Sequence, residues 1–561
     1  MPRSPPATHL LIAASGGTMK WTSRVPKVSA GYLQTARSLG AYRILFGLGL
    51  LLTFTPGRQV IGGVSREVGH VPDDFYHPPL GPFSLLSGWP SQPTLLALEI
   101  VMTIALVMIT IGAFTRSACL TFAVTGTTLA GFVFSTGKVD HIVLWTLVIP
   151  GIMAFTPWGD HLSVDSRRRR IQLRQRPGFR TDVVLPIQLV AVALSVMFAA
   201  AGIVKAASGW LTPGDSAVLG WTLRHQVEAG LQPSLPTALA PVPLGAWPIL
   251  DYITVVFEIG FLVAVLRRQW FVPYLVLAMA FHLGAAIMGL PGFNPIAVVY
   301  LLFLRLDRAA DTIEHAQALA RRHLPVVVTA ATVGALGYVG ASVALERPVT
   351  LQAALEHLGL PSGVILWALP LALAALVLAR SRGTQSRAGS RTPNWLMSAA
   401  VLLLAVQTTV TLAVSEPFPS VVGPLFMGSP DTGRVLHVRQ QRFVVMEGSA
   451  HTTVPHRAVL ALSPGGATLL GKVRFPAPPS GEDFQSRLAD QGHSFSSHHL
   501  KSYGGNLSAS ETAYIRRSLT NAGIACGANC TLRVEWYELT FGRQTGRLEH
   551  ERLVSHRDYA L

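Results

Sequence analysis

The sequence predicts an all-α bundle of about eleven membrane-spanning helices, followed by a small α+β domain. Three observations predict this fold class. Half of the 561 residues are hydrophobic and only 13% are charged, whereas about a quarter of the residues in a soluble chain are charged. Many apolar segments approach the roughly 20 residues that a helix needs to cross a bilayer. Residues 415–561 instead contain short β-rich runs separated by Gly, Pro and Ser clusters.

Eleven apolar segments are expected to span the membrane, of which the short eighth is expected to be a half-helix or part of a hairpin with the seventh. The segments are 38–55, 93–114, 117–135, 140–156, 182–204, 248–266, 270–290, 293–305, 325–344, 362–380 and 395–414. They divide into a first transmembrane unit at 37–305 and additional helices within 306–414.

The loops between these segments set the expected orientation. If residues 1–36 are cytoplasmic, the loops that must also be cytoplasmic are rich in arginine, as in "SRRRRIQLRQRPGFR" at 166–180. This alternation predicts an odd number of spans and an external C-terminus in a multi-pass protein of the plasma membrane. The formal charge of +16 lies largely in such loops, so we do not expect nucleic-acid binding.

The tail, residues 415–561, is expected to form an extracytoplasmic α+β domain. Its runs "HVRQQRFVVMEG" and "TLRVEWYELTF" are typical of strands, and "SASETAYIRRSLTNAGI" predicts a helix capped by Ser508 or Ser510. Cys526 and Cys530 could bind a metal or form a disulfide. With no second cysteine pair, a disulfide is favoured if the tail faces an oxidising compartment. The histidines at 493, 498 and 499 lack zinc-type spacing with any partner, so no metal site is expected.

Ionisable residues within the spans are costly to bury in lipid, so each is a functional candidate. They are Arg43, Glu99, Asp251, Glu258 and His282 within spans, with Asp140, His141 and Lys205 at the outer ends of spans. Asp251 and Glu258 are seven residues apart and lie on one helical face. We expect them to pair with Arg43 in a structural role.

The predicted topology brings three of these side chains to a similar depth. The fourth span begins outside at His141, and the fifth runs outward and ends at Lys205. His282 lies about eight residues, or roughly 12 Å, from the outer end of the seventh span. The three are therefore expected to converge in the outer half of the bilayer.

Lys205 has two interpretations. It is either an anchor whose amine extends to the lipid headgroups, or a buried lysine whose neutral amine acts as a base. The Ala-Gly pair in "AAGIVKAASGW" (200–210) permits close helix approach, which would help to bury the amine. For His141 and His282 the alternative to a functional role is a helix–helix hydrogen bond.

Five stretches carry a resemblance to a known family. They are "LGAYRILFGLGLLL" (39–52), "VDHIVLWTLVIPGIMAFTPWGDHLSVDSRRR" (139–169), "FAAAGIVKAASGW" (198–210), "LRHQ" (223–226) and "FHLGAAIMGLPGFNPIAVVYLLFL" (281–304). The chain resembles the vitamin K-dependent γ-glutamyl carboxylases and their bacterial relatives, the HTTM (horizontally transferred transmembrane) domain proteins, over roughly residues 37–305. The spacing A-G-x-x-K-x4-W, in which the lysine is Lys205 and the tryptophan is Trp210, is similar to that family's lysine segment.

The resemblance implies specific roles for residues. Lys205 corresponds to the base that deprotonates reduced vitamin K, His141 to its supporting histidine and His282 to a further pocket residue. Trp210 is expected to wall the site. The remaining residues expected to bind substrate are Asp140, Arg224 and His225.

The implied reaction uses a reduced vitamin K or menaquinol-like quinol together with O2 and CO2. The quinol is oxidised to an epoxide, and the strong base formed removes a γ-proton from a glutamyl residue of a protein or peptide before CO2 adds. The alternative is a non-catalytic, DoxX-like module that binds a quinone or a partner, with recognition in the external domain. Only the enzyme needs a neutral amine at Lys205, so Lys205→Ala is expected to stop quinol oxidation and leave folding nearly unchanged.

Overall fold

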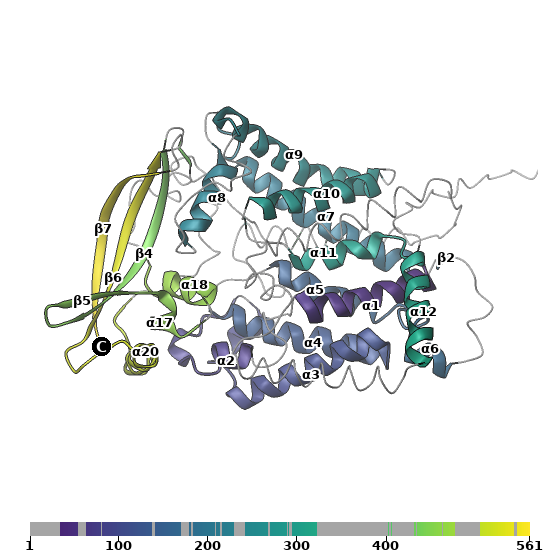
Figure 1. Ribbon diagram of the computed structural model, residues 1–561, viewed down its shortest axis with the longest axis horizontal. Coiled ribbons are helices and arrows are strands. Elements are labelled where there is room, and N and C mark those ends of the chain that lie inside the picture. Colours follow the sequence, from purple (N-terminus) through teal and green to yellow (C-terminus); the bar gives the residue numbers. More distant parts are fainter. Residues whose placement is uncertain are drawn as a thin grey trace, which may run out of the picture.

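The computed structural model describes residues 34–322 and 431–561 with gaps, the longest of which are 54–62, 170–178, 229–241 and 477–504, together with residues 402 and 406. The first range is a helical bundle, and the second, here called the sheet domain, lies at one end of the bundle (Figure 1). Apart from residues 402 and 406, the three predicted spans after residue 322 lie outside the described residues, as do His493, His498 and His499.

The helices of the bundle coincide with the first eight predicted spans, and their ends differ from the predicted ends by a few residues. They are α1 (Ala36–Thr53), α3 (Gln92–Ile111), α4 (Thr115–Phe134), α5 (His141–Met153), α7 (Val184–Ala207), α9 (Trp247–Leu266), α10 (Phe271–Ile287) and α11 (Asn294–Tyr300), which continues into the 3-10 turn η7 (Leu301–Phe303). Among the described residues, α3, α4, α7 and α9 are long and apolar enough to cross a membrane. The others are shorter or less apolar, and α11, in the short eighth segment, has seven residues.

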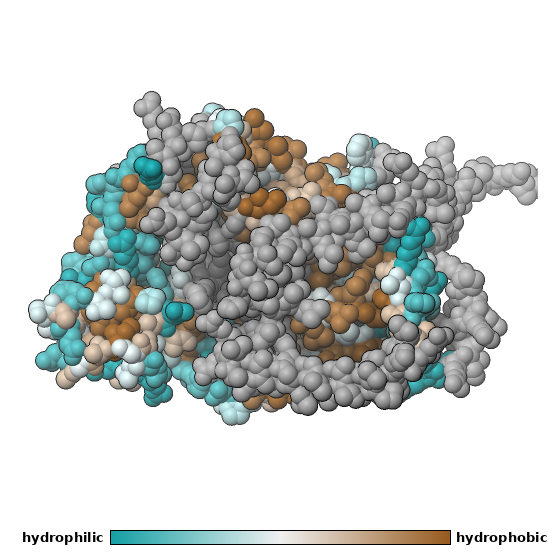
Figure 2. Space-filling model, viewed as in Figure 1, coloured by the Kyte–Doolittle hydropathy of each residue, from teal (hydrophilic) through white to brown (hydrophobic). Residues whose placement is uncertain are grey.

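Apolar side chains lie both inside the bundle and on its outer surface. Trp145, Trp158 and Phe122 are fully buried in its core. Ile104 on α3 and Val256 on α9 are 54% and 69% exposed, which suits helices that face lipid rather than water. Hydrophobic surface is accordingly visible along the bundle, between hydrophilic surfaces on the sheet domain and on the opposite end (Figure 2).

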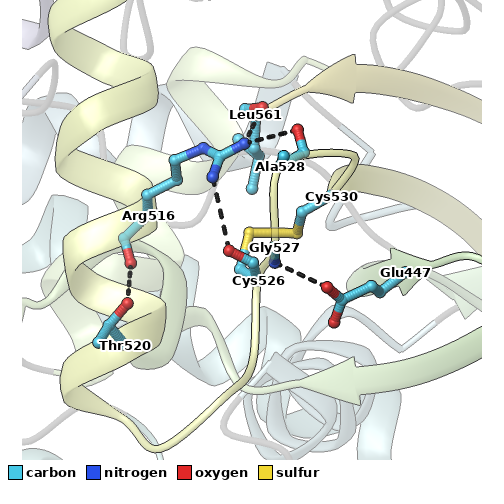
Figure 3. The surroundings of a disulfide bond; sticks show 8 residues. All are labelled: Glu447, Arg516, Thr520, Cys526, Gly527, Ala528, Cys530 and Leu561. Atoms are coloured by element: carbon cyan, nitrogen blue, oxygen red, sulfur yellow. Dashed lines mark hydrogen bonds between the residues drawn. A yellow bond between two sulfur atoms is a disulfide. The ribbon is translucent and has the colours of Figure 1, made fainter.

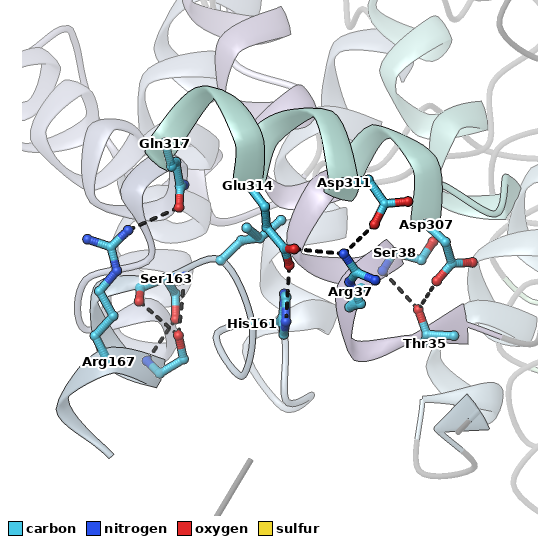
Figure 4. A network of polar contacts seen from close by, with 12 residues as sticks. Thr35, Arg37, Ser38, His161, Ser163, Arg167, Asp307, Asp311, Glu314 and Gln317 are labelled. Atoms are coloured by element: carbon cyan, nitrogen blue, oxygen red, sulfur yellow. Dashed lines mark hydrogen bonds and ion pairs between the residues drawn. The ribbon is translucent and has the colours of Figure 1, made fainter. Parts of the chain in front are cut away.

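The end of the bundle opposite the sheet domain is closed by the polar helix α12 (Asp307–Arg322), which lies near α6 (Val164–Arg168) (Figure 1). Arg37 donates to Asp311 and, at 2.7 Å, to Glu314 (Figure 4). Arg167 on α6 donates to Gln317 of α12 at 3.0 Å. These exposed and half-buried contacts tie α12 to the ends of α1 and α6, although each pair contributes little stability by itself.

The sheet domain is a five-stranded antiparallel sheet with helices on one face. Its strands run in the order β3 (Asp431–Thr432), β4 (Val435–Glu447), β6 (Thr531–Gly542) and β7 (Leu548–Ala560), and β5 (Ala450–Val454) also pairs with β4. The helices are α17 (His456–Leu460), α18 (Pro464–Arg474) and α20 (Ala509–Asn521). Leu470 of α18 and Ile515 of α20 are buried in one cluster with Phe443 and Val534 of the sheet. The small α+β composition of this region is as predicted.

Two local features of the sheet domain also match the sequence. Ser508 caps α20: its hydroxyl accepts from the Glu511 N–H, and the Glu511 carboxylate accepts from the Ser508 N–H at 2.8 Å. Cys526 and Cys530 form a disulfide, with Cα atoms 5.2 Å apart (Figure 3). The bond closes the short loop that leads into β6.

The sheet domain packs against the bundle in two places. Because side chains alternate along a strand, Leu539 and Phe541 of β6 lie on the face opposite Val534, and they cluster with α8 (Ala217–Glu228). At the second place, Phe75 of the 3-10 turn η2 (Asp73–Phe75) packs on Tyr514 of α20, with ring centroids 5.8 Å apart. The two contacts fix the sheet domain over one end of the helices.

His456 is a titratable group in the core of the sheet domain. Its Nε2 lies 3.1 Å from the Gln441 Oε1, and its ring packs on Phe443 with centroids 4.7 Å apart. Burial, together with the positive charge of Lys472, lowers the pKa of His456 to about 4. The pKa of a histidine in the unfolded chain is about 6.5, so the unfolded state binds this proton first as the pH falls. The stability that neutral His456 contributes is complete above about pH 6.5 and is lost as the pH falls through the folded pKa.

We therefore expect amide protection in β4 and α18 to weaken between about pH 6.5 and pH 4. His456→Gln should flatten this dependence, because glutamine does not titrate. Hydrogen exchange corrected for intrinsic rates would measure the effect, with His451→Gln on the exposed face of β5 as the control. Equal pH dependence in His456→Gln and the wild type would contradict the assignment.

Candidate functional site

Arg43 closes the end of a neighbouring helix. From α1 it donates to the carbonyls of Thr110 and Leu162, each at 2.6 Å, and to a third carbonyl near the end of α3. Carbonyls at a helix C-terminus have no partner within the helix, so the guanidinium supplies one. The predicted pairing of Arg43 with Asp251 or Glu258 is wrong, because the arginine is used to satisfy backbone carbonyls.

Buried carboxylates close helix N-termini in the same way. Asp251 of α9 accepts from the N–H groups of Ala217 and Val218, at 2.9 and 2.8 Å, where α8 begins. Glu99 of α3 accepts from the N–H and the hydroxyl of Ser65, at 3.2 and 2.7 Å, at the start of α2 (Val64–Val68). The free N–H groups and the helix dipole both favour a negative charge at these positions. Glu99 and Asp251 therefore have structural roles.

A cavity of about 50 Å³ lies between α7, α8, α9, α10 and the start of α11. Most of its wall is apolar and includes Met197, Phe198 and Met288. Its polar or aromatic lining consists of Lys205, Trp210, Thr254, Glu258, Phe281 and His282. Lys205 and His282, which the predicted topology brings to one depth, therefore line one cavity together with Trp210.

Lys205 forms a buried ion pair with Glu258. The Nζ of Lys205, on the last turns of α7, donates to Glu258 Oε1 on α9, and the two side chains are only 3% and 6% exposed. The Trp210 ring covers the amine, whose Nζ lies 5.1 Å from the ring centroid. An anchoring lysine would place its amine in water or among headgroups. The buried position of Lys205 therefore does not fit the anchor interpretation.

Gly202 allows α7 and α9 to approach closely beside this ion pair. A Cβ atom at Gly202 would lie 2.9 Å from Ile259 Cγ1 and 3.0 Å from Glu258 Cβ. A larger residue would push the two helices apart one turn from Lys205. The close approach expected from the Ala-Gly pair is confirmed.

His282 is held at the cavity wall by a hydrogen bond between helices. Its Nε2 lies 3.0 Å from the Tyr300 hydroxyl on α11, and its ring centroid lies 5.8 Å from that of Phe198. The side chain is 2% exposed. His282 therefore lines the cavity and also makes the helix–helix hydrogen bond that was its alternative interpretation.

The other predicted site residues are not brought into this cavity. Arg224 lies on α8 with its guanidinium over Trp221, 4.8 Å from the ring centroid, and is not part of the cavity wall. The side chains of His141 and His225 lie outside the described residues, as does the whole of Asp140. Sequence reasoning assigned Glu258 to the wrong partner. Depth within the spans could not have corrected this, because Lys205 and Asp251 both lie near the outer ends of their predicted spans and Glu258 lies deeper.

The sequence of the bundle matches a known family over residues 34–307, for which the matching family model is the HTTM domain. This part of the chain is thus similar to HTTM domains. The match includes every helix that borders the cavity and ends at the first residue of α12. No curated protein and no solved structure matches the chain. The candidate site therefore belongs to the HTTM domain, and the sheet domain lies beyond it.

The ion pair changes the expected effect of removing Lys205. Loss of one partner leaves a buried charge without compensation, which typically costs about 3–5 kcal/mol. We expect Lys205→Met and Glu258→Met each to lower the unfolding temperature in detergent, and the double variant to recover much of the loss. Arg66→Met on the exposed face of α2 is a control for lost surface charge. Additive effects of the two substitutions would show that the residues do not interact.

Proposed function

We propose that this HTTM protein is a membrane-bound, quinol-dependent oxygenase in which Lys205 deprotonates a reduced naphthoquinone. The observation that carries the proposal is a buried amine, held by Glu258, in the wall of a largely apolar cavity. A general base must lie within hydrogen-bond reach of the proton that it removes. A lipid-soluble quinol can reach such a cavity from the bilayer. The resemblance of the Lys205–Trp210 segment to the γ-glutamyl carboxylases supports this chemistry.

The Lys205–Glu258 pair offers a route to the neutral amine that a base requires. Transfer of the proton from Nζ to the carboxylate gives an amine and a carboxylic acid, which removes two charges from apolar surroundings. The amine then accepts the hydroxyl proton of the quinol: the O–H bond breaks, an N–H bond forms, and a quinolate remains beside the ammonium group. Trp210 covers the amine and limits its contact with water. O2 would be the oxidant, and the quinol would be oxidised.

The cavity suits a naphthoquinol in its chemistry but is small for one. Each enclosed water needs roughly 10–15 Å³ by the same kind of measure, so about 50 Å³ holds only a few water molecules. Sites for drug-sized ligands commonly enclose about 300–1,000 Å³. A quinol ring can enter only if the wall moves aside. Met197 and Met288 are unbranched and flexible, and they can repack at low cost.

We further propose that the sheet domain is extracytoplasmic and that the membrane is the plasma membrane. Two observations support this orientation. The arginine-rich segment at 166–180 begins in α6, at the end of the bundle away from the sheet domain (Figure 1), and such segments are retained in the cytoplasm. The Cys526–Cys530 disulfide is typical of an oxidising compartment. A glutamate-containing protein or peptide, if carboxylated here, would approach from the side of the sheet domain.

The proposed base can be tested with Lys205→Arg. Arginine stays protonated, so it can retain an ion pair with Glu258 but cannot accept the quinol proton. We expect quinol oxidation by the purified protein to fall by about 10²–10⁴-fold, with an unfolding temperature close to that of the wild type. Consumption of menaquinol under O2, epoxide formation and fixation of labelled CO2 would be measured together. Lys472→Arg in the sheet domain is the matched control, and wild-type turnover by Lys205→Arg would refute the role of Lys205.

The orientation can be tested separately. Reporter fusions at residue 175 and at the C-terminus should report opposite sides of the membrane, because the first lies in the arginine-rich segment and the second follows the sheet domain. Signals from the same side for both fusions would contradict the proposed topology.

A further inference from the structure

One oxygen of Glu258 is not accounted for by the ion pair. Oε1 accepts from Lys205, whereas Oε2 is buried and has no hydrogen-bond partner among the residues that the structure describes. Glu258 lines the cavity, and its side chain is 6% exposed. A buried acceptor without a donor costs free energy, more so when the group is charged. The site therefore holds an unsatisfied acceptor beside an enclosed space.

Two polar groups that line the cavity near Glu258 have hydrogen-bond partners elsewhere. The Thr254 hydroxyl, one turn before Glu258, donates to the Leu250 carbonyl at 2.8 Å. The His282 Nε2 lies against the Tyr300 hydroxyl at 3.0 Å. A molecule that occupies the cavity can therefore supply the donor that Oε2 lacks. The walls require that occupant to be mostly apolar.

We infer that Glu258 Oε2 accepts a hydrogen bond from a ligand hydroxyl and thereby selects the reduced, hydroxyl-bearing naphthoquinol over its oxidised forms. This inference rests on the proposed function and adds a specificity determinant to it. A quinol carries O–H donors at the ring positions where a quinone has only carbonyl acceptors. A carbonyl next to Oε2 would leave two acceptors facing each other without a proton. Sites built to pair with a hydroxyl reject analogues that lack it for this reason.

The same contact also favours release of the product. Oxidation to a quinone or an epoxide replaces the hydroxyl with a carbonyl, so the ligand loses the hydrogen bond to Oε2 when it has reacted. The carboxylate therefore binds the substrate form more tightly than the product form. Glu258 is in this respect a specificity residue as well as the partner of Lys205.

The inference can be tested by binding measurements without O2, where the quinol does not turn over. Menadiol and menadione would be titrated separately into the full-length protein in nanodiscs. We expect the wild type to bind menadiol roughly 10–100-fold more tightly, the range for a hydrogen bond to a charged group. In Glu258→Gln the ratio should fall to near one, because the amide NH2 can donate to a quinone carbonyl. Asp251→Asn, which changes a capping carboxylate on the same helix, should keep the wild-type ratio.

The outcomes separate this inference from the proposed function. Equal wild-type affinity for the two ligands would overturn the role of Glu258, while turnover of menadiol under O2 would leave the proposed function standing. A menadiol preference that persists in Glu258→Gln would also overturn it. If neither ligand binds to the wild type, both ideas fail. Should Glu258→Gln not fold, Lys205→Met/Glu258→Gln removes the whole ion pair, and its ratio should likewise be near one.

Discussion

Charged and backbone polar groups inside an apolar bundle must find partners within the protein, because lipid supplies none. The buried charges of this HTTM domain follow that constraint. Arg43 satisfies carbonyls at the end of α3, Glu99 satisfies the start of α2, and Asp251 satisfies the start of α8. In each case a side chain from one helix closes the end of another element. Every helix end leaves backbone groups without a partner in the helix, and in short helices such as α2 these groups are a larger share of the total.

The Lys205–Glu258 pair differs from these capping contacts in two respects. It joins two side chains rather than a side chain and a backbone end, so it is not needed to complete any helix. It also borders a cavity and leaves one carboxylate oxygen without a donor from the described part of the chain. An ion pair placed only for stability could be replaced by apolar residues at little cost. The position of this pair beside a cavity is what makes it a candidate for chemistry.

Much of the bundle could be predicted from hydropathy, because lipid requires apolar helices and eight apolar segments coincide with described helices, of which four are long and apolar enough to cross a membrane. The convergence of Lys205, Trp210 and His282 could also be predicted from the sequence, because it follows from span direction and from the spacing of the lysine segment. The partner of Glu258 could not be predicted from the sequence. Arg43 is a cation well inside a predicted span, and charge pairing alone favoured it. Its use as a helix cap depends on which carbonyls lie nearby in three dimensions, and sequence does not give that information.

The packing of the sheet domain is linked to the cavity through shared residues. Trp210 and Val218 line the cavity and also belong to the cluster that contains Val438, Leu539 and Phe541 of the sheet. Dense packing transmits displacements between such neighbours. A cavity of about 50 Å³ has to widen to admit a quinol ring. The cavity wall formed by Trp210 and α8 is in contact with the sheet. Movement of that wall would therefore change the packing between the bundle and the sheet domain.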